Sequence, residues 1–199
     1  MTDLIYGTAL PSELPLDVRE LSARLCDPSL TSVAELEPYV LRLSAAARPV
    51  YAILRAELKT DGSRLIFGGI ETESEGLLKL TEGCSSVLLC AMTLGAEVDR
   101  LITRQTARSS AEGFIADGVA SAMAEALAEY VSRVARQMYI SVTGRFSPGY
   151  GDLPLRVSEQ ILGLVDAQRR LGIKMASGGL MIPKKSITAI IGIKDPEGV

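Results

Sequence analysis

Nine residues near the middle of the chain, Ser85-Ser86-Val87-Leu88-Leu89-Cys90-Ala91-Met92-Thr93, form an almost unbroken apolar run. A run of this length and composition predicts a central strand that is buried on both faces. Leu94-Gly95-Ala96-Glu97 follows and predicts a turn into a helix that extends to about residue 107. A longer helix is expected over residues 111–139, where apolar side chains recur at helical spacing.

Working outward from this strand, the sequence predicts further helices and strands on both sides of it. The first dozen residues are expected to form an arm, and Pro38 to end or kink the second helix. Helices are predicted at residues 17–25, 33–47, 74–80 and 158–171, with strands at 50–58, 64–70 and 186–193. This order predicts an α+β fold: a mixed or antiparallel central sheet with long helices packed on it and a helical N-terminal lobe. Residues 1–48 are assigned to the arm and lobe, and residues 49–199 to the α+β region.

Composition excludes several function classes. The 21 Lys and Arg residues against 24 Asp and Glu give a formal charge of −3, so we expect neither a nucleic-acid partner nor a membrane surface. No signal peptide is expected, and Cys26, Cys84 and Cys90 are odd in number and irregularly spaced, which favours structural thiols in the cytoplasm. The chain has no His, which removes Ser-His-Asp catalysis and His-ligated zinc.

The loop Gly144-Arg145-Phe146-Ser147-Pro148-Gly149-Tyr150-Gly151-Asp152-Leu153-Pro154 is the strongest candidate for a ligand site. An arginine can hold a carboxylate with two parallel hydrogen bonds. Glycines let a ligand approach the main chain, and the proline restricts the loop. Taken singly, Arg145 could cap a helix and Tyr150 could be a rim residue.

Glu125 supplies a possible second half of this site. On the predicted long helix it shares a face with Gly118, Ser121 and Ala122, at spacings of three, four and seven residues. Together, Arg145 and Glu125 could complement the carboxylate and the ammonium of an amino acid. The alternatives are a solvated acidic stripe and close helix packing at Gly118. The turn Thr93-Leu94-Gly95 could also offer a helix N-terminus to an anion, or be only a tight turn.

Four ordered segments resemble the activation (reactivation) domain of cobalamin-dependent methionine synthase. Residues 145–150 resemble its R-x-x-x-G-Y signature, and residues 123–130 resemble the A-E-A-x-A-E-Y of its long helix. Residues 91–95 resemble its strand-to-helix turn, and residues 181–188 its late x-x-P-x-x-S-V-S strand. These pieces lie between about residues 65 and 193, and residues 1–48 have no match.

The resemblance implies an S-adenosylmethionine site in a shallow groove. Arg145 is expected to hold the ligand carboxylate, and Glu125 to match a helix carboxylate that helps to hold the ligand. The full expected set is Arg145, Phe146, Ser147, Pro148, Gly149, Tyr150 and Glu125, with no catalytic residue and no metal ligand. A cofactor-driven reaction needs positioning more than acid-base catalysis, so the absence of His is no objection.

The same resemblance implies partners. The chain is expected to act as a stand-alone reactivation subunit of methionine synthase, or of a related corrinoid methyltransferase. The partner would carry the cobalamin, and flavodoxin or another electron donor would supply the electron with which methylcobalamin is regenerated. Two alternatives stay open: a non-catalytic partner of a corrinoid protein, and an α+β protein that binds another amino-acid-like metabolite. Lys184-Lys185 departs from the family, which has small or neutral residues there.

Overall fold

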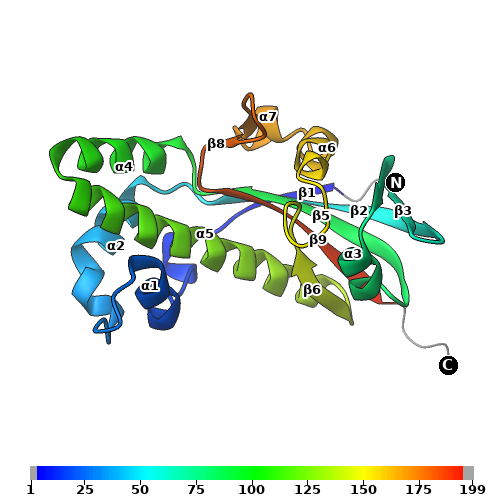
Figure 1. Cartoon of the computed structure of the whole chain (residues 1–199), viewed down its shortest axis with the longest axis horizontal. Helices are drawn as coiled ribbons and strands as arrows, with labels where there is room; N and C mark the ends of the chain where they lie inside the picture. The colour runs from blue at the N-terminus through cyan, green and yellow to red at the C-terminus, as the bar shows by residue number, and fades with distance from the viewer. Residues whose placement is uncertain (1–3, 195–199) are drawn as a thin grey trace.

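A computed structural model describes residues 4–194, and Figure 1 shows them arranged around one central sheet. The strands are β1 (Leu4–Thr8), β2 (Val50–Asp61), β3 (Arg64–Phe67), β4 (Ile70–Glu73), β5 (Cys84–Thr93), β6 (Val142–Phe146), β7 (Lys174–Met175), β8 (Met181–Ile182) and β9 (Ser186–Lys194). The helices are α1 (Val18–Leu25), α2 (Glu37–Ala46), α3 (Glu75–Leu80), α4 (Ala96–Arg108), α5 (Ser110–Met138), α6 (Arg156–Leu164) and α7 (Ala167–Arg170). Short 3-10 helices at Pro11–Glu13 and Val33–Leu36 precede α1 and α2 in the chain. The fold class is α+β, as predicted.

The main sheet has the strand order β4-β3-β2-β5-β9-β6, and each pairing in it is antiparallel. The long strand β2 pairs with β5 along one edge. Along its other edge, residues 50–54 pair with β1 and residues 58–61 pair with β3. Strand β6 lies at one end of the order and pairs only with β9 among the described strands, which places Arg145 and Phe146 of the predicted ligand site at a sheet edge.

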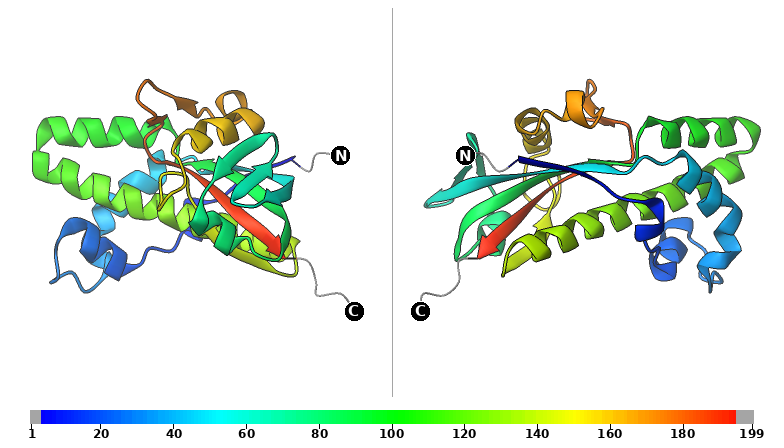
Figure 2. Two further views of the ribbon diagram at one scale, coloured as in Figure 1. Left: turned by 45° about the vertical axis from the view of Figure 1, so that its right-hand side comes forward. Right: turned by 180° about the vertical axis from the view of Figure 1, so that it is seen from behind.

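Helices cover both faces of the sheet, which explains the unbroken apolar run of β5. Figure 2 shows α1, α2 and α5 on one side of the sheet and α6 and α7 on the other. Neighbouring residues of β5 alternate between the two sides: Leu88 joins the core that contains Met123 of α5, and Leu89 joins the core that contains Ile161 of α6. All four side chains are at most 2% exposed. Burying a side chain of this size contributes roughly 2 kcal/mol to folding.

Helices α4 and α5 form a helical hairpin, and the two helices predicted at residues 96–107 and 111–139 are confirmed. Ser109 separates them, and its Oγ accepts a hydrogen bond from the Glu112 amide at 3.4 Å. Figure 1 shows α4 and the first half of α5 extending past the sheet, with α1 and α2 packed against α5. The helix α5 therefore links the N-terminal helices to the far edge of the sheet at β6.

Two segments predicted to be irregular form strands. Part of the expected N-terminal arm is β1, which is antiparallel to the first residues of β2. Part of the expected ligand loop is β6, so Arg145 and Phe146 lie on an edge strand rather than on a flexible connection. Both strands are only five residues long, and neither shows the alternation of apolar and polar residues that marks a strand in a sequence.

Three element boundaries also differ from the predictions. The helix predicted at residues 33–47 is a 3-10 helix as far as Leu36 and an α-helix, α2, from Glu37, so Pro38 lies in the first turn of α2, where proline is well tolerated, and does not end it. The single helix expected at residues 158–171 is split into α6 and α7 at Asp166, which has a φ of 49°. The β-hairpin of β2 and β3, predicted as strands at residues 50–58 and 64–70, gains a third strand, β4, because Gly68 and Gly69 turn the chain again with positive φ values.

The buried thiol of Cys90 lies in the middle of β5, and burial raises its pKa to about 12. That environment fits the structural role predicted for this residue. Cys26 is exposed at the end of α1. None of the helices within residues 4–194 combines the length and the apolar character needed to cross a bilayer.

Candidate functional site

Arg145 is held at the edge of the sheet by an irregular strand. Strand β6 pairs Val142 with Ile193 but Arg145 with Ile191, so one extra residue forms a bulge. At this bulge, the Gly192 amide donates to the Thr143 hydroxyl at 2.8 Å, which replaces a missing ladder bond. The bulge turns Arg145 toward α5.

Glu125 meets Arg145 from the middle of α5. The Arg145 guanidinium donates through Nη2 to Glu125 Oε2 at 2.5 Å, and both side chains are about one third exposed, at 29% and 31%. The sequence predicted that these two residues would face one ligand, and the structure brings them into direct contact. Glu125 Oε1 lies 3.9 Å from Nη2 of Arg24, a residue of α1 that the sequence analysis did not single out.

The loop after β6 is tightly organised. Gly149 has a φ of 89°, its amide donates to the Leu153 carbonyl at 2.8 Å, and the Tyr150 amide donates to the Ser147 carbonyl at 3.1 Å. Pro148 is buried, whereas Tyr150 is 74% exposed. The loop therefore has a fixed backbone that carries an exposed aromatic ring.

Asp152 anchors this loop to helix α3. Its carboxylate accepts hydrogen bonds from the Ser74 hydroxyl and the Glu75 amide, both at 2.5 Å, and from the Gly76 amide at 3.3 Å. The bond from Ser74 is the main reason why the pKa of Asp152 lies below its usual value of 3.8. This contact could not be predicted from local sequence, because Ser74 and Asp152 are 78 residues apart.

Phe146 and α3 complete the support of the loop. Phe146 packs against the core on the α6 side, opposite to Arg145. A Cβ atom on Gly76 would lie 2.9 Å from Phe146 Cζ, so the missing side chain in α3 leaves room for the ring. The strand thus directs its arginine to one side of the sheet edge and its phenylalanine to the other.

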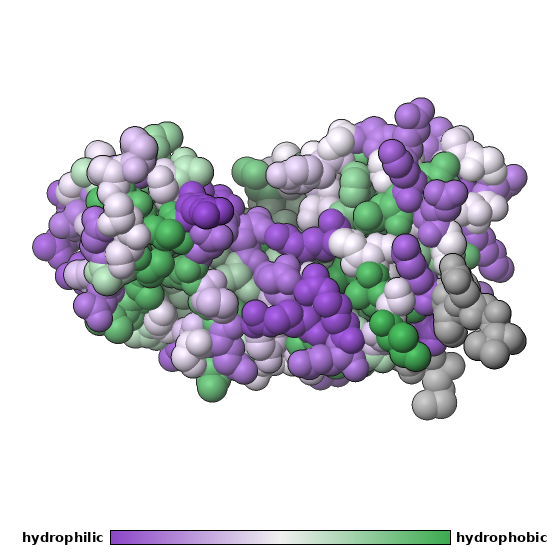
Figure 3. Space-filling view, turned by 90° about the horizontal axis from the view of Figure 1, so that it is seen from below, coloured by the Kyte–Doolittle hydropathy of each residue, from purple (hydrophilic) through white to green (hydrophobic). Residues whose placement is uncertain are grey.

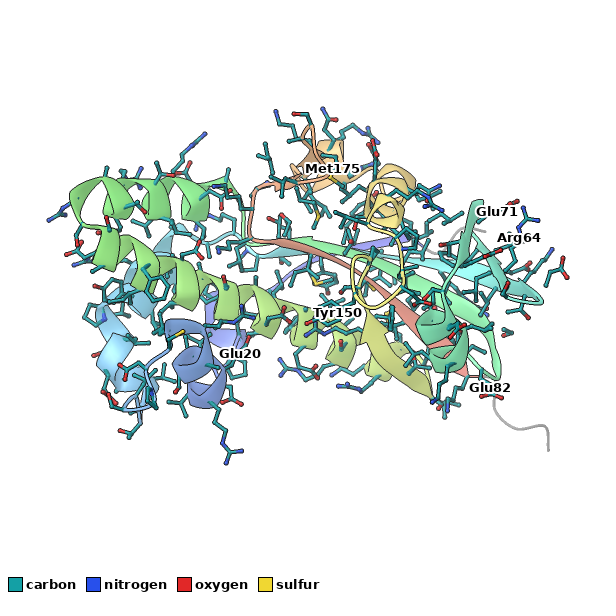
Figure 4. All side chains as sticks on the ribbon, in the orientation of Figure 1. Glu20, Arg64, Glu71, Glu82, Tyr150 and Met175 are labelled. Atoms are coloured by element: carbon teal, nitrogen blue, oxygen red, sulfur yellow. The ribbon has the colours of Figure 1, made fainter. Side chains whose placement is uncertain are left out.

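A shallow pocket of about 240 Å³ lies where the loop passes α5. Its lining includes five of the seven residues predicted for the site, namely Glu125, Arg145, Phe146, Ser147 and Tyr150. Pro148 and Gly149 shape the loop without lining the pocket. Figure 4 shows Tyr150 over α5 at this place. Seen from below in Figure 3, the surface is hydrophilic along its middle and is notched between the two halves of the molecule.

The small-residue face of α5 has two roles other than ligand contact. Gly118 is buried, and a Cβ atom there would lie 2.6 Å from Leu25 Cδ2, so close helix packing accounts for this glycine. The Ser121 hydroxyl accepts a hydrogen bond from the Lys185 ammonium at 2.8 Å, and Asp117 Oδ1 accepts another at 2.7 Å. The lysine that departs from the family pattern therefore occupies the helix face one turn before Glu125.

The turn at Gly95 lies outside the pocket lining. Gly95 has a φ of 90°, and its amide donates to the Thr93 hydroxyl at 3.1 Å. A Cβ atom there would lie 3.5 Å from Arg48 Cβ. These contacts favour the simpler of the two interpretations, a tight turn from β5 into α4.

Comparisons with known proteins show what this fold is. No protein-family model matches the chain, and no curated protein matches it. Among solved structures, the chain is similar to the crystal structure of the MetH reactivation domain bound to AdoHcy, with a TM-score of 0.72. The match covers 98% of this chain and 79% of that chain, at 17% sequence identity. The chain therefore has the fold of that reactivation domain, which the sequence resemblance predicted.

Proposed function

We propose that this chain binds S-adenosylmethionine at the pocket between Arg145 and Glu125. In this proposal it supports reductive methylation of a cobalamin that a methionine synthase, or a related corrinoid methyltransferase, carries. The observation that carries the proposal is the pocket itself. Residues that the R-x-x-x-G-Y resemblance selects line one cavity, and a solved structure of similar fold holds AdoHcy, the demethylated product of S-adenosylmethionine.

The chemistry of the pocket suits the amino-acid end of this ligand. A guanidinium has five N–H donors, and the bond to Glu125 uses one, so Arg145 keeps donors for a carboxylate. Glu125 can accept from the ligand ammonium. Because Asp152 fixes the loop to α3, the main chain from Phe146 to Gly149 is positioned before the ligand arrives, which lowers the cost of ordering it.

The size of the pocket suits a ligand that is shared with a partner. Pockets that bury a whole drug-sized ligand measure about 300–1,000 Å³, and this one measures about 240 Å³. Part of the ligand must therefore stay at the surface. An exposed sulfonium can give its methyl group to a cobalamin on another protein, and S-adenosylhomocysteine is then the leaving group. The cobalamin supplies the cobalt chemistry, a flavodoxin-like or other donor supplies the electron, and this chain supplies position.

Calorimetric titration of the whole chain with S-adenosylmethionine tests the binding step. We expect saturable heat with wild type and at least tenfold weaker binding by Arg145→Ala, because a charge-assisted bond contributes about 1.5–3 kcal/mol. Arg136→Ala is the matched control, since Arg136 also pairs with a glutamate of α5, Glu129, at 2.8 Å but lies outside the pocket lining. No heat with wild type, or equal binding by the Arg145 variant, contradicts the proposed site.

A reconstitution assay tests the reaction. The chain is mixed with a cobalamin-loaded methionine synthase that lacks its own reactivation domain, a chemical reductant and S-adenosylmethionine. We expect S-adenosylhomocysteine to form only when this chain is present. Ligand binding without turnover with any corrinoid partner favours the non-catalytic alternative. Binding of free methionine or another amino acid, but not of S-adenosylmethionine, favours the amino-acid-like metabolite.

A further inference from the structure

The carboxylate of Glu125 lies between two arginines, one hydrogen-bonded to it and one at longer range. Oε2 accepts the hydrogen bond from Arg145 at 2.5 Å, and Oε1 lies 3.9 Å from Nη2 of Arg24. Among the described residues that line the pocket, Glu125 is the one carboxylate. A cationic ligand therefore meets a carboxylate whose charge Arg145 offsets through a hydrogen bond and Arg24, itself paired with Glu20, offsets further at longer range.

The packing of α1 against α5 explains how Arg24 reaches this place. Gly118 has no side chain, and Leu25 fills the space where its Cβ atom would be. Gly118 and Glu125 are seven residues apart, two turns along the same face of α5. Leu25 thus sets its neighbour Arg24 beside Glu125, and Glu20, one turn earlier on α1, accepts from Nε and Nη2 of Arg24 at 2.9 and 2.7 Å. Figure 4 shows Glu20 on the flank of α1 next to α5.

Two other carboxylates that touch the site's framework are also engaged. Asp152 accepts hydrogen bonds from Ser74 and from amides at the start of α3. Asp117 accepts from the Lys185 ammonium at 2.7 Å. Neither is free to face a positive charge on a ligand in the pocket.

We propose that Arg24 is a specificity-determining residue: by offsetting the charge of Glu125, it makes the site nearly indifferent to a positive charge on the ligand sulfur. This inference rests on the proposed function and concerns S-adenosylmethionine against S-adenosylhomocysteine. The two ligands share their carboxylate, ammonium and nucleoside, and differ in one methyl group and one positive charge. Two methylene groups separate the sulfur from the carbon that bears the ammonium, so a carboxylate near the ammonium also acts on the sulfur.

The consequence concerns the reaction product. A site that does not select the sulfonium binds the demethylated product about as well as the substrate. Release of S-adenosylhomocysteine then depends on exchange with fresh S-adenosylmethionine or on the partner protein. Selection for the methyl donor would come from groups that the partner adds to the exposed side of the pocket.

Calorimetry with the whole chain tests this by the ratio of the two dissociation constants. We expect S-adenosylmethionine and S-adenosylhomocysteine to bind wild type within about threefold of each other. Arg24→Gln removes the positive charge that lies 3.9 Å from Glu125 Oε1, and the ratio should shift toward S-adenosylmethionine by about three- to fivefold, the size of one partly exposed charge pair. Arg24→Met repeats the test with a side chain that keeps the apolar stem, and Arg136→Gln, which alters a different arginine–glutamate pair, should leave the ratio unchanged.

The ratio of the two dissociation constants distinguishes a change in selectivity from a loss of folded structure, because a general loss of structure weakens the binding of both ligands alike. A wild-type preference of more than tenfold for S-adenosylmethionine overturns the inference and leaves the proposed function intact. An unchanged ratio in both Arg24 variants also overturns it. If wild type binds neither ligand, the proposed function fails first and the inference fails with it.

Discussion

The charge cluster at the pocket predicts an asymmetry between its members. Arg145→Gln removes one ion pair and leaves Glu125 with Arg24. Glu125→Gln removes both pairs and leaves two arginines near one another, with Glu20 as a counter-charge for Arg24 only. The glutamate should therefore matter more for stability than the arginine that it contacts more closely.

The burial of the cluster sets the size of this effect. The side chains of Arg24, Glu125 and Arg145 are 34%, 31% and 29% exposed, so solvent screens them in part. An exposed pair contributes about 0.2–1 kcal/mol, and we expect Arg145→Gln to cost less than about 1 kcal/mol. Glu125→Gln should cost about 1–2 kcal/mol, because it loses two pairs and adds repulsion. For a chain of this length, 1 kcal/mol corresponds to about 2–4 °C in the melting temperature.

Thermal unfolding of wild type, the two single variants and the double variant, without ligand, measures this asymmetry. The double variant should melt above Glu125→Gln, because removing Arg145 relieves the repulsion. Raising the salt to about 1 M shortens the screening length to about 3 Å, and the differences should shrink. Equal costs for the two single variants, or a gap that does not respond to salt, would refute this account of the cluster.

Three further predictions concern the loop and the thiols. Asp152→Asn should lower the melting temperature at pH 7, where the wild-type carboxylate is charged. The difference in melting temperature between variant and wild type should narrow as the pH falls toward 3.8. The difference should vanish once the pH is below the lowered pKa of Asp152, where the wild-type carboxyl is protonated and uncharged like the amide. Gly149→Ala places a Cβ at a φ of 89° and should cost about 1–2 kcal/mol in urea unfolding, whereas Gly144→Ala, whose Cβ meets nothing within 4 Å, should cost less than about 0.5 kcal/mol. Iodoacetamide should modify exposed Cys26 in the native protein, and mass spectrometry should find Cys90 unmodified until the chain unfolds, because its pKa is about 12 and it is fully buried.

The central elements of the fold could be predicted because local sequence determines them. The apolar run of β5 needs burial on both faces wherever it lies, and the stripe on α5 needs a partner surface. The helix predicted at residues 74–80 is α3, and Ser74 caps its start, since its hydroxyl accepts from the Leu77 amide at 3.1 Å. These signals lie within a few residues of the structure that they specify.

The two strands that were not predicted, β1 and β6, lack such local signals. Strand β6 is short, contains Gly144 and carries a bulge, and its partner β9 begins 40 residues after β6 ends. Strand β1 is stabilised by β2, which begins more than 40 residues after it. A short edge strand gains its stability from a neighbour that is distant in the chain, so its own residues need not show a pattern.

The site, like the fold, was predicted only in part. Arg145 and Glu125 were selected from complementary charge and from a family resemblance, and the structure places them in contact. Arg24 was missed because it reaches Glu125 only through the packing of α1 on α5, across 101 residues of sequence. The local sign of that packing was Gly118, which the sequence analysis recognised as a possible helix contact without identifying Leu25 as the partner.

The position of the pocket at a sheet edge ties the fold to the proposed reaction. A site buried between the sheet and its helices would enclose a ligand but would hold its methyl group away from any second protein. Strand β6 instead presents Arg145 at the rim, and Asp152 holds the following loop rigid without covering the pocket. The exposed ring of Tyr150 then lies on the open side, 74% accessible, where it can contact a partner as well as a ligand. A rigid rim combined with an open side is the arrangement expected of a protein that positions a methyl donor for chemistry carried out on another chain.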